Sequence, residues 1–487
     1  MGMSVMPPPP DQAGSPHGRL RLRAAVGRAL LALAAVAVLG GALMWLGARN
    51  DRRRPPEESA DGMPSAGQQE LSAADAAALL RLSPDVPTTA EALNREAFEI
   101  CDRLVRDLPQ RPEAYAVAAF ILNRHGRTAD AAQVWRKALD VNPRFAPAYS
   151  GLGAVMTKKG DYQEAVPLLR DALELDPGVE QVYRLLVDAL LHQNQADQAL
   201  TVAEEYARRF PRSPDGHYWL GRAYAESGRH EEARLSGEEA VRLDPDYTQA
   251  YYSLATVCAR LGDSDRARVC REKFAELKER DADEDRRQKK EYEDFATQQS
   301  LAASYYLAAG RVYTDFGDPR KAEAHWLRGA AIAPALTECR EALVKFYTQR
   351  ERPAAALRLL DDLTAAAPDN HEHWVVRGRL QTGLGQLDVA EASFRKAVEL
   401  APSQLAGYTG LIDLALSHQR PIPDVARLAQ KAAELAPSAL AYLRLSAVRD
   451  QQGDRPGAIA AAKRAVELEP RDKRAHELYE RLLRDAP

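Results

Sequence analysis

The sequence predicts an all-α protein: a right-handed superhelical solenoid of antiparallel helix pairs that follows one N-terminal transmembrane helix. Three observations support this fold class. Prolines recur at a nearly constant spacing, small and large residues hold fixed places within each period, and one uncharged stretch lies near the N-terminus. A fixed period of roughly this length is typical of stacked helical repeats, in which each unit contacts only its neighbours.

The prolines end helices in two regular runs. They follow phrases such as "ELDP" and "ELAP", and a proline there stops a helix because it has no amide donor. The spacing is constant in the first run and varies only slightly in the second. The first run is Pro143, Pro177, Pro211 and Pro245, and the second is Pro334, Pro368, Pro402, Pro437 and Pro470.

Small and large residues occupy fixed places in each period. In the period that begins at Ala146, Gly153, Ala165 and Ala172 stand at positions 8, 20 and 27. Small side chains there let two helices approach closely, and larger ones such as Leu169 fill the space between neighbours. Glycines near position 15, such as Gly160, open the turn inside each pair.

This arrangement resembles tetratricopeptide repeats, over ten repeats in residues 112–472. The resemblance implies two helices per repeat and a concave groove lined by positions 2, 5, 9, 12 and 13 of each first helix. A half-matching pair precedes the array at 71–82 and 90–108. Three departures from this pattern predict locally looser repeats. They are Pro167 inside a helix, the pair Ala203 and Tyr206, and the Pro421-Ile422-Pro423 loop.

The uncharged stretch from Ala29 to Gly47 predicts a membrane anchor. Its 19 residues would span about 28 Å as a helix, close to the thickness of a bilayer core. We therefore expect a basic tail at 1–28, a transmembrane helix at 29–48 and a disordered linker at 49–70. A cleaved signal peptide is the alternative. Four arginines flank each side, so orientation follows from the short tail: a cytoplasmic N-terminus and an exported, periplasmic body of a bacterial protein.

A charged segment separates the two proline runs. Residues 271–294 hold eight basic and ten acidic residues without proline or glycine, a pattern of a long solvent-exposed helix. We expect a second helix that runs on toward Tyr305, as a solvated strut, a docking helix or a coiled-coil element. The predicted organisation is a first repeat block at 71–270, this extension at 271–300, a second block at 301–472, and a capping helix at 473–487.

Charge and cysteine content narrow the function classes. The chain has a net charge of −4, and residues 1–54 carry eight arginines and two aspartates, +6, so the rest carries −10. An acidic body argues against a nucleic-acid partner, which favours a basic stripe. The four cysteines show no metal-binding spacing and are expected as buried helix residues. They are Cys101, Cys258, Cys270 and Cys339.

No motif in the sequence points to chemistry. A nucleophile elbow, a phosphate-binding P-loop and an HExxH zinc motif are all missing from the sequence. His371 and His373 lie one residue apart, but without further ligands they are expected as surface residues. We therefore predict no enzyme activity, no catalytic residues, no metal and no cofactor.

The resemblance places aromatic and basic residues on the concave face, a mixture that is enriched at interface hot spots. We call this set the groove residues and expect them to bind an extended peptide or an acidic segment of a protein. The candidates are Phe120, Asn123, Arg124, Lys158, Arg184, Tyr218, Arg222, Tyr252, Arg311 and Arg379, with Asp188, His192 and Arg260 beside them.

The predicted function is a membrane-tethered protein–protein interaction scaffold, with no nucleic acid or small-molecule substrate. Two alternatives remain open. One is an accessory or assembly subunit of an envelope, secretion or pilus complex. The other is a regulatory subunit that delivers substrate to a separately encoded enzyme.

Overall fold

The computed structural model describes residues 86–292, 294–422 and 424–484, and these fold into 22 helices without strands. The described chain divides into two compact units, unit 1 at 86–333 and unit 2 at 334–484. This division lies one helix pair after the charged segment that marked the boundary in the sequence. The predicted tail, transmembrane helix and linker fall outside the described residues, as does the predicted helix at 71–82.

Unit 1 contains thirteen helices joined by short turns. They are α3 (Ala90–Asp107), α4 (Pro112–Arg124), α5 (Thr128–Val141), α6 (Ala146–Lys159), α7 (Tyr162–Leu175), α8 (Glu180–His192), α9 (Ala196–Arg209), α10 (Pro214–Glu226), α11 (His230–Leu243), α12 (Thr248–Arg260), α13 (Ser264–Tyr292), α14 (Phe295–Asp315) and α15 (Pro319–Ile332).

Unit 2 contains nine helices. They are α16 (Glu338–Gln349), α17 (Pro353–Ala366), α18 (His371–Gly383), α19 (Leu387–Leu400), α20 (Leu405–Ser417), α21 (Val425–Leu435), α22 (Ala439–Gln451), α23 (Arg455–Leu468) and α24 (Lys473–Arg484).

The helices pack as consecutive pairs, as predicted. From α4 to α13 in unit 1 and from α16 to α23 in unit 2, each first helix packs along its own second helix, and each second helix packs against the next first helix. The small positions explain the close approach. A Cβ added to Gly153 would lie 2.6 Å from the Leu169 side chain, and one added to Gly378 would lie 2.7 Å from the Phe394 ring. Gly160 caps α6 at φ 82°, where a side chain would be strained.

The third repeat buries the large side chain that departs from the pattern. Ala203 and Tyr206 exchange the usual order of large and small, yet Tyr206 is fully buried. Its ring stacks on Tyr183 at 5.6 Å between centroids and meets Phe210 edge-on. Two aromatic side chains of the same repeat therefore enclose the Tyr206 ring.

Two other departures have different outcomes. Pro167 lies inside α7, which nevertheless continues to Leu175. In the ninth repeat, the second helix α21 is shortened to 11 residues and begins after Asp424, whose φ is 62°. The proline-rich loop therefore shortens this helix at its first turn.

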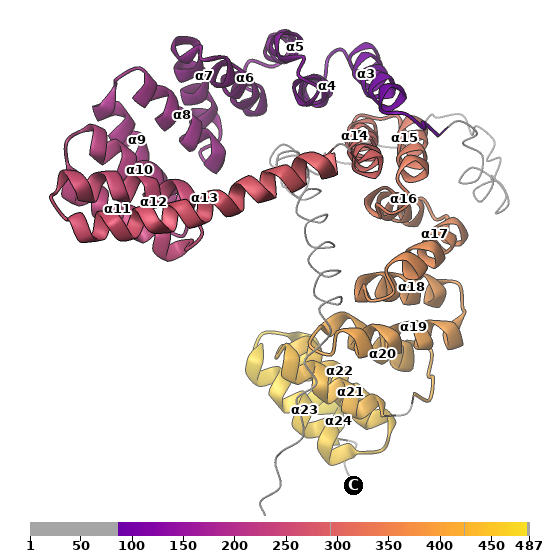
Figure 1. The fold of residues 1–487 in the computed structure, drawn as a ribbon. Coiled ribbons are helices and arrows are strands. Elements are labelled where there is room, and N and C mark those ends of the chain that lie inside the picture. Colours follow the sequence, from indigo (N-terminus) through magenta and orange to yellow (C-terminus); the bar gives the residue numbers. More distant parts are fainter. Residues whose placement is uncertain (1–85, 293, 423, 485–487) are drawn as a thin grey trace, which may run out of the picture. The chain divides into compact units, whose positions relative to one another are not determined.

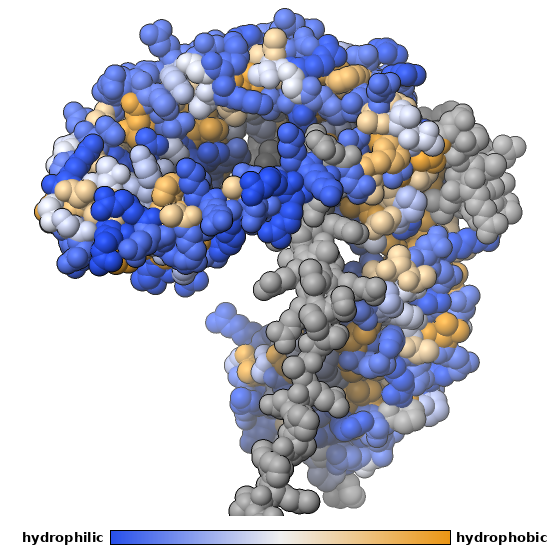
Figure 2. All heavy atoms as spheres, viewed as in Figure 1, coloured by the Kyte–Doolittle hydropathy of each residue, from blue (hydrophilic) through white to orange (hydrophobic). Residues whose placement is uncertain are grey.

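The charged segment forms most of α13, a helix of 29 residues. It does not run on to Tyr305 as predicted, because a new helix, α14, begins at Phe295 after an extended Asp294. Up to Asp281 α13 is anchored on α12: Leu277 is fully buried and Thr248 donates a hydrogen bond to Asp281. Figure 2 shows hydrophilic side chains covering its outer length. Among the described helices, the one that packs along α13 is its own repeat partner α12, so a coiled-coil element is not supported.

The end of unit 1 packs against its first helices. Helix α14 packs against α3 and α4 as well as against its partner α15, and the three helices α3, α14 and α15 lie together in Figure 1. The sequence pattern did not predict this contact.

Two further expectations concern the ends and the cysteines. A helix, α24, follows the last repeat and buries Ala475 and Leu482. Cys101, Cys258 and Cys339 are buried and Cys270 is half-buried, all as free thiols. No helix within the described residues is long and apolar enough for a membrane crossing.

Candidate functional site

The first helices of unit 1 lie next to one another. Helix α4 contacts α6, α6 contacts α8, α8 contacts α10, and α10 contacts α12. Residues at one repeat position therefore form rows that cross these helices. One row holds Arg184, Tyr218 and Tyr252, and another holds Asp188 and Arg222, with each member one full repeat after the last.

A polar cluster joins α8 and α10 in the middle of these rows. Asp188 lies 3.6 Å from His192 Nε2 and 4.0 Å from Arg222 Nη1. The His192 ring stacks on Tyr162 with centroids 4.5 Å apart and an interplanar angle of 5°. Sequence analysis missed Tyr162 because it begins a second helix, whose residues were not expected in the groove.

Tyr218 and Arg222 are held in place by aromatic neighbours. The Tyr218 ring lies 5.1 Å from Tyr247, and burial raises the pKa of its hydroxyl although Arg222 opposes this shift. The Arg222 guanidinium lies 4.9 Å from the Trp219 ring. Both side chains are half-buried, so they present a rigid surface.

Tyr252 is the most open aromatic side chain of the groove set, at 61% exposure. Its ring lies 5.3 Å from Phe274 on α13, and Lys278 lies 5.5 Å above Phe274. An exposed tyrosine on a rigid support buries a large area when a partner covers it. Tyr252 therefore has the placement of a contact residue.

The remaining groove residues of unit 1 lie toward its first helices. Phe120 and Asn123 are half-buried on α4, while Arg124 and Lys158 are exposed at the ends of α4 and α6. The Oδ1 atom of Asn123 is buried without a hydrogen-bond partner within the structure.

Several groove cations have no acidic partner within the described part of the chain. Arg124, Lys158, Arg184 and Arg260 form no ion pair there. Many basic residues of the second helices do, for example Arg234 with Glu231 and Glu238. The predicted groove face of unit 1 therefore carries four cations without an ion-pair partner among the described residues.

Two predicted groove residues lie outside the run of helices from α4 to α12. Arg311 is exposed on α14, which follows α13 and packs against α3 and α4 instead of α12. Arg379 is exposed on α18 in unit 2. The candidate site is therefore the face of α4, α6, α8, α10 and α12.

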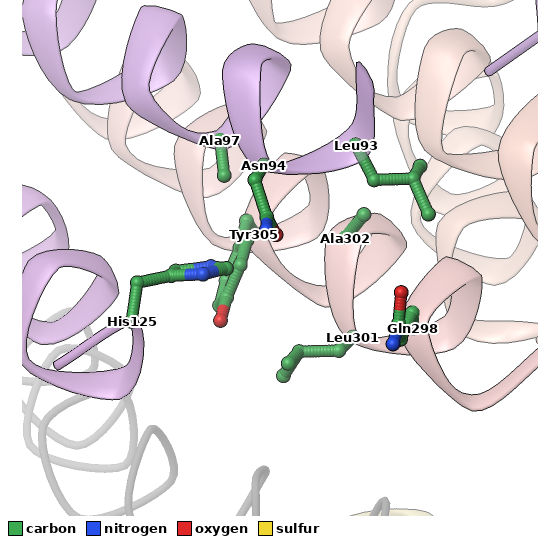
Figure 3. A pocket seen from close by; sticks show the side chains of 8 residues that line it. All are labelled: Leu93, Asn94, Ala97, His125, Gln298, Leu301, Ala302 and Tyr305. Carbon is green, nitrogen blue, oxygen red and sulfur yellow. The ribbon is translucent and has the colours of Figure 1, made fainter. Parts of the chain in front are cut away.

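A small pocket lies beside this face, where α3, α4 and α14 meet (Figure 3). Its volume is about 110 Å³, enough for a few water molecules. The His125 ring faces Tyr305 with centroids 5.7 Å apart. The lining residues are Leu93, Asn94, Ala97, His125, Gln298, Leu301, Ala302 and Tyr305.

In the His371-x-His373 pair, His373 serves the fold. His373 is buried, contrary to the expected surface position, and its Nε2 lies 3.0 Å from Glu341 and 3.3 Å from Asn370. A hydrogen bond from His373 lowers the pKa of Glu341 despite its burial. Within the described residues, no group of three His, Cys, Asp or Glu side chains is placed to hold a metal ion.

These features define a helical repeat protein whose candidate site is an extended face of stacked helices. Two family models described as tetratricopeptide repeat match the chain, one at residues 122–180, 184–248 and 344–404, and the other at 248–273. The chain therefore contains tetratricopeptide repeats, as the sequence pattern predicted. Such repeats mediate protein–protein interactions.

Solved structures of other repeat proteins are similar over part of the chain. YrrB, a TPR protein with an unusual peptide-binding site, is 20% identical, with 36% of this chain and 91% of its own covered and a TM-score of 0.33. MamA from Desulfovibrio magneticus RS-1 is 23% identical, with 36% and 97% covered and a TM-score of 0.32. PilF of Pseudomonas aeruginosa is 19% identical, with 48% and 97% covered and a TM-score of 0.31. No curated protein matches the chain.

Proposed function

We propose that the protein is a membrane-tethered scaffold that captures an extended acidic segment of another protein on the groove face of unit 1. The tether is the predicted helix at 29–48, and the body is exported into the periplasm. Binding is the whole of the proposed activity, because the groove residues are suited to recognition and the sequence offers no catalytic motif.

The observation that carries this proposal is the set of groove cations without acidic partners. Arg124, Lys158, Arg184 and Arg260 stand on four of the five neighbouring first helices. An extended chain that crosses those helices would meet them in succession. The guanidinium groups can grip carboxylates with two parallel hydrogen bonds.

Aromatic residues add apolar contact to this charge recognition. Tyr252 offers an exposed ring and Tyr218 a half-buried one in the same row. Tyrosine and arginine are the residue types that dominate interface energies. The favoured ligand is therefore a peptide in which carboxylates alternate with apolar or aromatic side chains.

Asp188 makes Arg222 a poor first choice for testing this proposal. A glutamate at 222 would repel Asp188 and lose the contact with Trp219, so it would also disturb the fold. Lys158 and Arg184 are better targets because they have no ion-pair partner among the described residues.

The test is binding of a fluorescent peptide of alternating glutamate and tyrosine to the purified chain in detergent. We expect the double variant Lys158→Glu/Arg184→Glu to weaken binding at least tenfold, about 1.4 kcal/mol. The matched control is Lys137→Glu/Arg208→Glu, which changes the net charge equally at two exposed, unpaired cations on second helices. Equal affinities for the two variants would overturn the proposed site.

A further inference from the structure

Two clusters of hydrogen bonds and ion pairs join the beginning of unit 1 to its end. Glu96 on α3 accepts hydrogen bonds from Arg328 Nη2 and from Tyr306 Oη, both at 2.5 Å. Asp107, at the other end of α3, accepts from Tyr313 Oη at 2.8 Å and from Lys321 Nζ at 2.9 Å. These contacts bridge 206 to 232 positions of sequence.

The polar part of this contact pairs acids with bases and phenols. The acids all come from α3, and the bases and phenols come from α14 and α15. A polar contact is typical of surfaces that separate within a folded chain.

Packing across this contact is also incomplete. The 110 Å³ pocket of Figure 3 lies within it, between Leu93 and Asn94 on α3 and Leu301 and Tyr305 on α14. Side chains that line a void lose part of their dispersion contacts. The contact therefore lacks the dispersion contacts that would form if this space were filled.

The covalent link on the other side does little to hold α14 in place. Helix α13 is anchored on α12 as far as Asp281, and the described side chains at 283–287, 289 and 290 are exposed. Helices α14 and α15 are themselves extensively packed on each other, and α3 is packed on α4. Each side is thus able to stay folded without the other.

We propose that α3 is a releasable clasp: α14 and α15 detach together from α3 and α4, so that unit 1 opens while both helix groups stay folded. Opening uncovers Glu96 and Asp107 on one side and Tyr306, Tyr313 and Arg328 on the other. It also frees His125, which directly follows the groove residues Asn123 and Arg124. The clasp thereby controls access to the α4 end of the groove.

The test measures distances between spin labels by double electron–electron resonance. One label is placed at Arg95→Cys on α3 and the other at Ala324→Cys on α15, both exposed sites, with Cys270→Ser in the background. The other native cysteines are buried, and burial raises the pKa of Cys101 to about 12, so it does not compete for the label. A second pair, Arg95→Cys and Ala129→Cys on α5, reports whether α3 stays on α4.

We expect Glu96→Gln/Asp107→Asn to add a population at longer distance for the α3–α15 pair, while the α3–α5 pair keeps its distribution. The matched control, Glu91→Gln/Asp102→Asn, removes two exposed charges of α3 outside the contact and should leave both distributions unchanged. An unchanged α3–α15 distance in the first variant would overturn the clasp. A change in the α3–α5 distance would also overturn it, since α3 would then have unfolded instead of being released.

Discussion

At the scale of single residues, glycines set how closely neighbouring helices approach. A Cβ on Gly378 would lie 2.7 Å from the Phe394 ring, whereas one on Gly383, in the same helix, would meet nothing within 4 Å. We expect Gly378→Ala to destabilise unit 2 by about 1–3 kcal/mol through overpacking. Gly383→Ala should be neutral or stabilising, because alanine favours the helix by about 1 kcal/mol.

Urea unfolding of the two variants, followed by circular dichroism, gives the comparison. The order of their midpoints is the informative quantity, because repeat arrays need not unfold in a single step. If Gly378→Ala unfolds at the same urea concentration as Gly383→Ala, the close contact with Phe394 does not set the packing.

The same residues show what a repeat pattern can predict. Gly378 and Phe394 stood on marked positions, and the structure brings them into contact as the pattern required. Tyr206 did not fit the pattern, yet its ring is fully buried. The pattern records which side chain is usual at a position, but not that Tyr183 and Phe210 can enclose a ring placed one turn away.

At the scale of elements, α13 is a packed helix for its first part and a solvated one beyond it. Leu277 is fully buried although most of its neighbours along the helix are charged. We expect Leu277→Ala to lower the stability of the α12–α13 pair by about 2–4 kcal/mol. Glu276→Ala, at the adjacent exposed position, should change it by less than about 0.5 kcal/mol. Hydrogen exchange of α12 and α13 amides would contradict this assignment if both variants opened equally.

The contact of α3 with α14 and α15 is expected to make the stability of unit 1 depend on pH. His325 is buried beneath it, beside Tyr306 and Tyr313 of α14 and close to Lys321 and to Arg103 and Asp107. Burial lowers its pKa, so the folded state favours the neutral ring. The unfolded chain, with an ordinary pKa near 6.5, then takes up a proton first. The part of the stability that depends on neutral His325 is therefore fully present above about pH 6.5 and is lost as the pH falls below it.

Melting temperatures at pH 7.5 and 5.5 test this dependence. The wild-type chain should lose stability on acidification, and His325→Gln should lose less. The control is His418→Gln, which changes an exposed histidine and should behave as the wild type. Burial also lowers the pKa of His125, so part of the pH dependence of stability remains in every variant. An equal loss in all three proteins would contradict the role of His325.

At the scale of the whole molecule, the sequence predicted the helix pairs but not the closure of unit 1. A repeat pattern specifies contacts between neighbours that lie one repeat apart in the chain. The contact of Glu96 with Arg328 spans 232 positions, and neither residue stands out in its own repeat. The break before Phe295 was not predicted either, because alternating charge predicts a helix but not the position where it ends.

The groove was likewise predicted as a list of positions and not as a surface. Arg184, Tyr218 and Tyr252 lie on neighbouring helices because their spacing follows the repeat. Arg311 has the same family position, yet α13 carries it away from α12 and α14 places it near α3 and α4. The interruption of the period, more than the period itself, therefore decides which residues share a site.

The membrane tether gives the last prediction. Residues 29–47 hold 19 uncharged residues between two groups of arginines, and burying such a helix in a bilayer is strongly favourable, whereas electrostatic attachment is lost at high pH and salt. We expect the full chain to stay in the membrane fraction after alkaline carbonate extraction, and a variant lacking residues 1–70 to be released. The released variant should bind the acidic peptide with unchanged affinity, because the groove face lies wholly within unit 1. N-terminal sequencing of the membrane-bound protein separates the remaining cases: a start beyond residue 47 would show cleavage of a signal peptide, and extraction of the full chain by carbonate would refute the anchor.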